Sequence, residues 1–233
     1  MNIVSFSGGK DSTAMLLMMI ERGIPIDRVI CVDTTKEFPQ MYEHIQKVQE
    51  MISPLEIEIV KINFDYWFGE HIKNKGSKKG EKGYGWPGIK GRWCTRVKVN
   101  TLDELKENID DAVEFMGIAA DELKRTEKKY LQNRSVRFPL AEWQITSKQA
   151  LEYCYSKGLD WGGLYEKFHR VSCWCCPFSR IGSLRTLYNE FPGLWHEVET
   201  MDKKTSWEFR NDYSVQDLSE RFAHENLQGK LQL

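Results

Sequence analysis

The chain lacks any apolar run long enough to cross a membrane, and its N-terminus has the pattern of a strand and not of a signal peptide. It also lacks an excess of charge, because 33 Lys and Arg residues against 34 Asp and Glu residues leave a net charge of −1. No global field therefore attracts nucleic acid, and any basic surface has to be local. We expect a cytoplasmic protein without a membrane partner.

The sequence also lacks the composition of a disordered chain and any internal repeat. A hydrophobic content of 41% excludes a disordered chain, and no segment repeats itself. With 233 residues, the chain is long enough for one domain with an appendage. In an intracellular protein, its six cysteines favour metal or redox chemistry over structural disulfides.

The N-terminal half alternates strand and helix patterns. Apolar segments predict strands at residues 3–6, 28–32, 57–62, 112–118 and 136–138. Helical patterns follow the first two of these strands, from Thr13 to Arg22 and from Pro39 to Met51. Strands separated by helices predict an α/β fold with a Rossmann-like, doubly wound, mostly parallel sheet, which binds ligands at the carboxyl ends of its strands.

Beyond about residue 141 the alternation gives way to helical segments rich in aromatic residues. These segments lie at residues 146–156 and 181–189, and in a tail from residue 214 that is first amphipathic and then polar. We therefore expect two parts. Residues 1–140 would form the nucleotide-binding domain, and residues 141–233 would form a helical part that carries the cysteine run.

A short segment, Ser7 to Ser12 with the sequence SGGKDS, lies between the first predicted strand and the first predicted helix. We call it the glycine loop. It is neither the G-x-x-x-x-G-K-[ST] motif nor the G-x-G-x-x-G motif. Gly8 and Gly9 let the backbone turn tightly and approach a ligand, and the first amides of the following helix then point at an anion. This order of elements predicts a phosphate-binding loop.

The side chains of the glycine loop support the same prediction. Lys10 adds a positive charge, and Ser7 and Ser12 add hydroxyl donors. Asp11 beside a phosphate-binding lysine is costly unless a metal or the chemistry requires it, which weakens the alternative of an ordinary strand–helix turn. The chain is expected to handle a nucleotide.

Residues 73–92 form a second distinctive segment, in which glycine and lysine are mixed with Tyr84 and Trp86, and Trp93 follows. So much glycine and lysine argues against regular structure. Two interpretations stay open: a solvated, mobile loop, or a lid or phosphate-steering arm whose aromatic side chains stack on bases. The segment permits nucleic-acid binding without proving it.

Four cysteines form the second strong signal. Cys173 and Cys176 have the C-x-x-C spacing that lets two thiolates face one ion, and Cys175 lies between them. Cys94 lies upstream among four cationic side chains, which stabilise thiolates and anionic clusters alike. The four cysteines could hold one Zn²⁺ ion or a [4Fe–4S] cluster, and we favour the cluster because adjacent cysteines suit it.

Other conspicuous residues have ordinary expected roles. Cys31 and Cys154 fall in a predicted strand and a predicted helix, so both are expected to be buried thiols. The five histidines show no metal-binding spacing with one another. Trp161 is expected to be a packing anchor of the helical part.

With these signals together, the chain resembles the phosphoadenosine-phosphosulfate reductase family, which belongs to the adenine-nucleotide alpha hydrolases with a pyrophosphatase loop (PP-loop). The resemblance runs from about Asn2 to Phe178. The glycine loop is similar to the family's phosphate loop. The further segments that resemble family motifs are residues 32–34, 37–39, 117–122, 139–140, 143 and 164–165.

The resemblance implies a site for ATP or another adenine nucleotide. The glycine loop would bind the phosphates, and the backbone from Cys31 to Thr34, which includes Asp33, would hold adenine and ribose together with Gly117. Cys94, Cys173 and Cys176 fall where iron–sulfur members of the family carry their cluster ligands.

Three departures from the family pattern point to a different substrate. No cysteine follows Cys176, whereas reductases carry a nucleophilic cysteine in a C-terminal tail. Cys94 stands alone where cluster-bearing reductases have tandem cysteines. Ala119 occupies a position where the family often has arginine.

The leading hypothesis is a PP-loop ATP pyrophosphatase that adenylates an acceptor and releases pyrophosphate, in sulfur transfer or modification. Lys10 and Asp11 would be the catalytic residues, and Asp11 would be a ligand of the Mg²⁺ that accompanies ATP. A sulfur donor protein or a thiol reductant would be the partner, and nucleic acid is a further candidate. Two alternatives stay open: a sulfonucleotide reductase that uses another thiol, such as Cys175, and a non-catalytic nucleotide- and metal-binding module.

Overall fold

A computed structural model describes residues 1–76, 78–88, 91–107, 109–127, 131 and 134–231, with only the backbone for 229–231. Its five-stranded sheet has the order β3-β2-β1-β4-β5, and every neighbouring pair is parallel. The strands are β1 (Asn2–Ser5), β2 (Arg28–Asp33), β3 (Ile57–Lys61), β4 (Val113–Met116) and β5 (Val136–Arg137). The predicted α/β fold with a mostly parallel sheet is confirmed.

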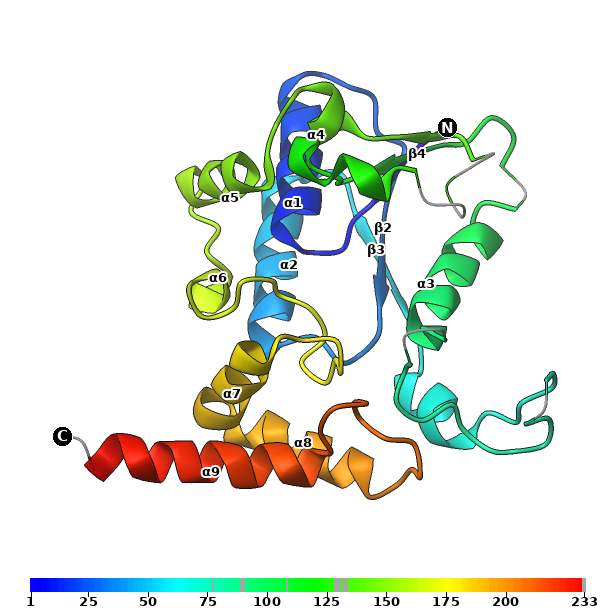
Figure 1. The fold of residues 1–233 in the computed structure, drawn as a ribbon. Coiled ribbons are helices and arrows are strands. Elements are labelled where there is room, and N and C mark those ends of the chain that lie inside the picture. The colour runs from blue at the N-terminus through cyan, green and yellow to red at the C-terminus, as the bar shows by residue number, and fades with distance from the viewer. Residues whose placement is uncertain (77, 89–90, 108, 128–130, 132–133, 232–233) are drawn as a thin grey trace. The chain divides into compact units, whose positions relative to one another are not determined.

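Helices cover both faces of this sheet, as Figure 1 shows for α1 and α2 on one side and α3 on the other. The α-helices are α1 (Lys10–Glu21), α2 (Pro39–Met51), α3 (Trp93–Glu104), α4 (Pro139–Glu142), α5 (Ser147–Ser156), α6 (Leu164–Lys167), α7 (Ile181–Glu190), α8 (Pro192–Asp202) and α9 (Val215–Leu231). Shorter helical turns are η1 (Tyr66–Glu70), η2 (Ala120–Arg125) and η4 (Trp161–Gly163). Ile3 and Ile30 are fully buried and pack against Leu102 of α3, as expected for a parallel sheet with two covered faces.

The predicted strands are all present, with ends that shift by no more than two residues. Helix α2 has the predicted bounds, and α5 begins after Thr146, whose hydroxyl and Gln149 form a capping box. Helix α1 begins at Lys10 and not at Thr13, because Gly9 is its N-cap residue. This difference places half of the glycine loop inside the first helical turn.

Helix α3 was not predicted. Its first half has β-branched residues at every second position, Thr95, Val97 and Val99, which is a strand-like period. Trp93 is the one residue of the helix that is buried, and all residues of α3 are described. A single buried anchor gives the sequence little helical periodicity to detect.

The chain divides into two compact units, which we describe separately. The first unit contains residues 1–33, 37–62 and 98–165. The second contains residues 34–36, 63–97 and 166–233. These units are groups of residues in contact and not independently folding domains. The expected domains, residues 1–140 and 141–233, therefore stay a prediction.

The described part of residues 73–92 belongs to the second unit. Residues 71–76 and 78–83 run antiparallel to each other as a hairpin, which we call the basic hairpin. The Lys73 amide donates to the Glu81 carbonyl at 2.9 Å, and the Gly83 amide donates to the His71 carbonyl at 2.8 Å. A Cβ on Gly83 would lie 2.3 Å from the Phe68 carbonyl oxygen, so glycine allows this close approach. Turns and isolated bridges therefore hold the segment, in keeping with the expected lack of regular structure. Lys90 of the predicted loop lies outside the described residues.

Nowhere in the described part of the chain does a helix combine the length and the apolar character needed to cross a membrane.

Candidate functional site

The glycine loop lies in the first unit, at the carboxyl end of the sheet. It follows β1, and Gly117 follows β4, the neighbour of β1 at which the strand order reverses. Open α/β sheets bind ligands in the crevice outside the strand ends at such a reversal. The fold thus brings two segments that were predicted to bind a nucleotide to one place.

Gly117 contacts the first turn of α1 directly. A Cβ on Gly117 would lie 2.7 Å from both the amide nitrogen and the Cα of Ser12. The clash would be with backbone, which cannot rotate away as a side chain can. Gly117 therefore sets how closely β4 approaches the N-terminus of α1, and its role in holding the nucleotide stays a prediction.

Gly8 gives the glycine loop its turn. Its φ of +74° is a backbone conformation that favours glycine, and a Cβ would also lie 2.7 Å from Met41 Sδ. Trp161 donates from Nε1 to the Gly8 carbonyl at 2.8 Å and is only 1% exposed. This tryptophan, expected to anchor the helical part, anchors the glycine loop within the first unit.

Two serine hydroxyls tie the loop to itself. Ser12 Oγ donates to the Gly9 carbonyl at 2.9 Å and accepts from the Ser7 amide at 3.2 Å. The Ser7 and Ser12 hydroxyl oxygens lie 3.0 Å apart. These bonds fix the loop in its turned shape without using the first amides of α1.

The N-terminus of α1 has the features of an anion site. Gly9, the N-cap residue, has no side chain to bond the amides of the first turn. The Lys10 amide donates to the Tyr165 hydroxyl at 2.9 Å. Tyr165 thereby adds an O–H group beside the helix end, where the dipole favours negative charge.

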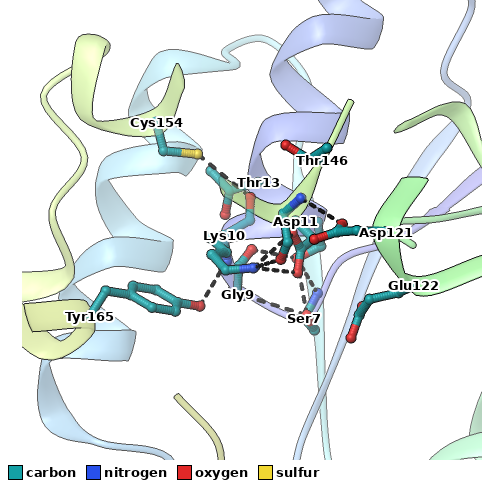
Figure 2. A network of polar contacts seen from close by, with 12 residues as sticks. Ser7, Gly9, Lys10, Asp11, Thr13, Asp121, Glu122, Thr146, Cys154 and Tyr165 are labelled. Carbon is teal, nitrogen blue, oxygen red and sulfur yellow. Dashed lines mark hydrogen bonds and ion pairs between the residues drawn. The ribbon is translucent and has the colours of Figure 1, made fainter. Parts of the chain in front are cut away.

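Lys10 and Asp11 form an ion pair at the start of α1 (Figure 2). Lys10 Nζ lies 2.9 Å from each Asp11 carboxylate oxygen and also contacts the Ser147 hydroxyl. Ser147 Oγ donates in turn to Asp11 Oδ1 at 3.1 Å. The side chains of Lys10 and Asp11 are 15% and 20% exposed, so the pair is shielded but reachable from solvent.

Asp121 and Glu122, which belong to the segment 117–122 that resembles a family motif, have partners within the first unit. Asp121 Oδ1 accepts from the Ser147 amide at 2.8 Å, next to the Lys10–Asp11 pair (Figure 2). Glu122 pairs with Arg125 three residues later. Asp121 therefore positions the start of α5, which brings Ser147 to Lys10.

His44 is buried behind the glycine loop. Its Nε2 lies 3.0 Å from the Thr13 hydroxyl, and its ring stacks on Trp161 with centroids 4.2 Å apart. Burial lowers the pKa of His44 to about 3, with a smaller contribution from Lys47. The histidine is therefore neutral at physiological pH and acts as a packing group, in line with its expected ordinary role.

Replacing His44 should flatten the pH dependence of stability. The pKa of about 3 in the folded chain lies below the value of about 6.5 that the unfolded chain would have. The unfolded chain thus binds the proton first, and stability that is fully present above about pH 6.5 falls by ~1.4 kcal/mol per pH unit as the pH drops. Between pH 7 and pH 5 the wild-type protein should lose about 2 kcal/mol of stability for this reason, and His44→Gln should not. Urea unfolding at the two pH values measures the difference. Unchanged pH dependence would contradict this assignment, and His224→Gln, at an exposed histidine, is the control.

Asp33 ends β2 and is 4% exposed. Its Oδ1 accepts from the Tyr42 hydroxyl at 3.1 Å, and burial together with this carboxylate raises the pKa of Tyr42. Nearby, Glu37 pairs with Lys98 at 3.5 Å. Thr34, the next residue in the chain, belongs to the second unit, where its Oγ1 lies 3.2 Å from Cys173 Sγ. The nucleotide roles of Asp33 and Thr34 stay predictions.

The four candidate metal ligands all lie in the second unit. Cys94 is in the first turn of α3, and Cys173, Cys175 and Cys176 precede α7. Burial raises the pKa of the Cys176 thiol, the neighbouring Cys94 raises it further, and Arg92 lowers it. The Trp174 amide donates to the Lys36 carbonyl at 3.0 Å, which fixes the cysteine run beside residues 34–36.

Cys94 is near enough to Cys176 to affect the pKa of its thiol, but two cysteines are not a complete ligand set. Among the described residues, which include all four cysteines, no three His, Cys, Asp or Glu side chains are placed to hold one metal ion. Thiolates are ligands that both groups accept, but their placement does not form a complete set, so a [4Fe–4S] cluster and a Zn²⁺ ion both stay predictions. Cys31 and Cys154 are buried, as predicted, and burial raises the pKa of each thiol to about 12.

Ser147 and Tyr165 were missed as site residues. Both contact Lys10 from positions more than a hundred residues away in the chain. Thr146 and Gln149 signal the start of a helix at Ser147, but no local pattern indicates which other helix it meets. Only the packing of α5 against α1 brings Ser147 to the glycine loop.

Comparisons with known proteins come from sequence and from structure. An uncharacterized protein of Methanocaldococcus jannaschii, MJ0066, is 30% identical over 211 residues, which cover 85% of this chain and 41% of that protein. The chain thus spans about two fifths of that relative's length. A solved structure, the U34-tRNA thiolase NcsA from Methanococcus maripaludis with its [4Fe–4S] cluster, matches with a TM-score of 0.45 and 15% identity. That match covers 87% of this chain and 70% of the other, and so weak a likeness says nothing of what this chain binds.

The family itself is shown by the sequence. Residues 1–179 match the phosphoadenosine phosphosulfate reductase domain, a span that includes the glycine loop, Gly117 and the cysteine run. The resemblance that the motifs predict, from about Asn2 to Phe178, covers nearly the same residues. The chain belongs to the phosphoadenosine phosphosulfate reductase domain family, within the PP-loop superfamily.

Proposed function

We propose that this protein binds ATP, or another adenine nucleotide, at the glycine loop and acts at the α-phosphate. In this reaction an acceptor oxygen attacks the α-phosphorus, the bond to the leaving pyrophosphate breaks, and the acceptor becomes adenylated. A sulfur nucleophile can then displace AMP, which gives the protein a role in sulfur transfer or modification. Family membership supports the nucleotide, and the contact of Lys10 with Asp11 behind two glycines carries the proposal.

The residues of the glycine loop would supply most of the catalytic effect by position and charge. The amides of the first turn of α1 and the Lys10 ammonium would neutralise phosphate oxygens as charge shifts toward pyrophosphate. Because Lys10 is only 15% exposed, its charge acts through a medium that screens less than bulk water. Ser147 and Tyr165 would act as positioning residues that hold Lys10 and its amide in place.

Asp11 is the proposed ligand for Mg²⁺. Mg²⁺ is usually held by one or two carboxylates together with substrate phosphates and water. The partly exposed Asp11 carboxylate at the glycine loop matches this kind of coordination. When bound with ATP, Mg²⁺ supplies further positive charge against the phosphate oxygens. Asp11 would exchange its contact with Lys10 for the metal, which leaves the Lys10 ammonium to the phosphates.

The alternative of a sulfonucleotide reductase has one observation against it. Cys175, the thiol considered in place of a tail cysteine, is only 2% exposed. A nucleophilic thiol needs access to its substrate and a stabilised thiolate. The burial of Cys175 therefore favours adenylation of an acceptor over direct attack by this thiol.

Purified protein with ATP, Mg²⁺ and candidate acceptors tests the proposal. We expect pyrophosphate release, or exchange of labelled pyrophosphate into ATP where adenylation is reversible. Binding of ATP without either reaction would favour a non-catalytic nucleotide-binding module. Sulfite release from an adenylyl sulfate with a thiol reductant would favour the reductase instead.

We further propose that Cys94, Cys173 and Cys176 hold an iron–sulfur cluster, because all three lie within the residues that match the family and belong to the same unit. Anaerobically purified protein should then contain iron and sulfide and show a broad absorbance band in the visible range. Cys94→Ser and Cys176→Ser should lose both, whereas Cys154→Ser, at a buried thiol of the first unit, should keep them. A colourless protein that contains zinc in stoichiometric amount would contradict the cluster and indicate a structural zinc site.

A further inference from the structure

The second unit contains a cavity that the proposed function does not use. Its volume is about 550 Å³, within the range of about 300–1,000 Å³ that is usual for sites of small ligands. Four aromatic side chains and two lysines account for most of its lining: Tyr84, Trp86, Trp93, Trp207, Lys73 and Lys78. So many flat rings beside cations are typical of a site for an aromatic anion.

Trp86 and Trp93 make the fixed part of the wall. Trp86 donates from Nε1 to Asp202 Oδ1 at 2.8 Å, and Trp93 donates from Nε1 to the Gly85 carbonyl at 2.9 Å. The side chains are 2% and 6% exposed. Because their polar N–H groups already have partners, these indoles offer only apolar surface to a ligand.

Trp207 and Tyr84 make the accessible part. Trp207 is 36% exposed, and Tyr84 is half-buried. Lys78 Nζ lies 3.6 Å from the centroid of the Trp207 ring, and Lys73 Nζ lies 4.8 Å from it. Two cations thus lie over the face of a partly exposed ring, and a base that stacks there has to displace Lys78 from it. Lys73 is already paired with Glu81 at 3.2 Å. Lys78 is therefore the better candidate to meet an anion.

The basic hairpin extends positive charge beyond the cavity. Between residues 73 and 82 the chain has five lysines and one acidic residue, Glu81. Lys75, Lys79 and Lys82 are exposed. In a chain with a net charge of −1, this hairpin is the kind of local basic surface that a polyanion requires.

We propose that this cavity holds an unpaired nucleotide of a nucleic-acid strand, with its base stacked on Trp207 and Tyr84 and its phosphate at Lys78. Stacking on aromatic faces suits any base, and a cavity of this size has room for one. The exposed lysines of the basic hairpin would follow the neighbouring phosphates, which favours a strand over a free nucleotide. This site is separate from the glycine loop and does not depend on ATP being the nucleotide there.

Fluorescence anisotropy with a labelled oligo-uridine of about ten nucleotides tests the stacking. We expect Trp207→Ala to weaken binding by about tenfold or more, and Trp207→Phe, which keeps an aromatic face, to weaken it by less than about threefold. Equal losses in the two variants, or none in either, would overturn the proposal. Thermal melts identify any variant that does not fold, and the lysine pair below then carries the test.

Lys78→Gln and Lys79→Gln form a matched pair, because both remove one charge from neighbouring positions and only Lys78 lines the cavity. Loss of one phosphate contact should lower the slope of log K against log salt by about 0.7 in Lys78→Gln, with a smaller change in Lys79→Gln. Equal changes would indicate diffuse attraction and overturn a defined site. Uridine monophosphate that competes as well as the labelled strand would also overturn it, and the Lys10→Ala protein should bind the strand as the wild type does.

Discussion

Lys10→Ala should lower ATP-dependent pyrophosphate release by about a hundredfold or more. The substitution removes the ammonium that lies 2.9 Å from both Asp11 oxygens and leaves the carboxylate to repel the phosphates. A group that acts on charge that develops in the transition state affects kcat more than ground-state binding. Steady-state kinetics should therefore show a large fall in kcat, while calorimetry shows a smaller loss of ATP affinity.

Lys148→Ala is the matched control for this experiment. It removes the same side chain from the same unit, but Lys148 is 85% exposed and pairs with Glu152 on its own helix. We expect wild-type kinetics, because an exposed pair of this kind contributes little. Ser147→Ala should fall between the two, since it removes a hydroxyl that positions Lys10 and Asp11. A Lys10→Ala enzyme with wild-type kcat would rule out the proposed catalytic role of the glycine loop.

Gly117→Ala should be among the most destabilising single methyl additions in this chain. The new Cβ would lie 2.7 Å from the backbone of Ser12, so β4 and α1 would have to separate. Overpacking of this kind costs about 2 kcal/mol, which corresponds to a fall in Tm of about 4–8 °C for a chain of this size. Nucleotide binding should weaken as well, because the first turn of α1 would move.

Two other glycine substitutions separate packing from ligand contact. Gly182→Ala, in α7, meets no atom within 4 Å and should leave stability unchanged or raise it. Gly9→Ala would make only ordinary contacts of 3.5 Å at a φ of −72°, so it should keep its Tm. Its methyl group would nevertheless fill space beside the helix end, and ATP affinity should fall. Equal Tm values for wild type and Gly117→Ala would show that β4 and α1 are not as close as described.

The part of the fold that carries the glycine loop was predictable because its signals are local. Each buried strand is a short apolar run, and the two glycines with Lys10 and Asp11 occupy adjacent positions in the chain. The order of strands and helices then leaves few topologies, since parallel crossovers are right-handed. The meeting of the glycine loop with Gly117 follows from that topology.

The rest of the site was not predictable because it depends on tertiary packing. Tyr165 reaches the Lys10 amide from α6, and Trp161 reaches the Gly8 carbonyl from η4. Tyr165 lies in a segment that resembles a family motif, but nothing in that motif indicates a contact with Lys10, and Trp161 belongs to no such segment. Trp161 was assigned to core packing on composition alone, which cannot distinguish a core tryptophan from one that holds a functional loop.

The way the chain alternates between its two units has a consequence for the order of folding during synthesis. The segment 63–97 carries Trp86, whose ring packs edge-on against Phe209 at 4.8 Å and whose N–H needs Asp202. Both partners leave the ribosome only when the last part of the chain is made. The aromatic segment therefore stays exposed until its partners are made, and a chain cut short before Asp202 would keep that surface open to aggregation.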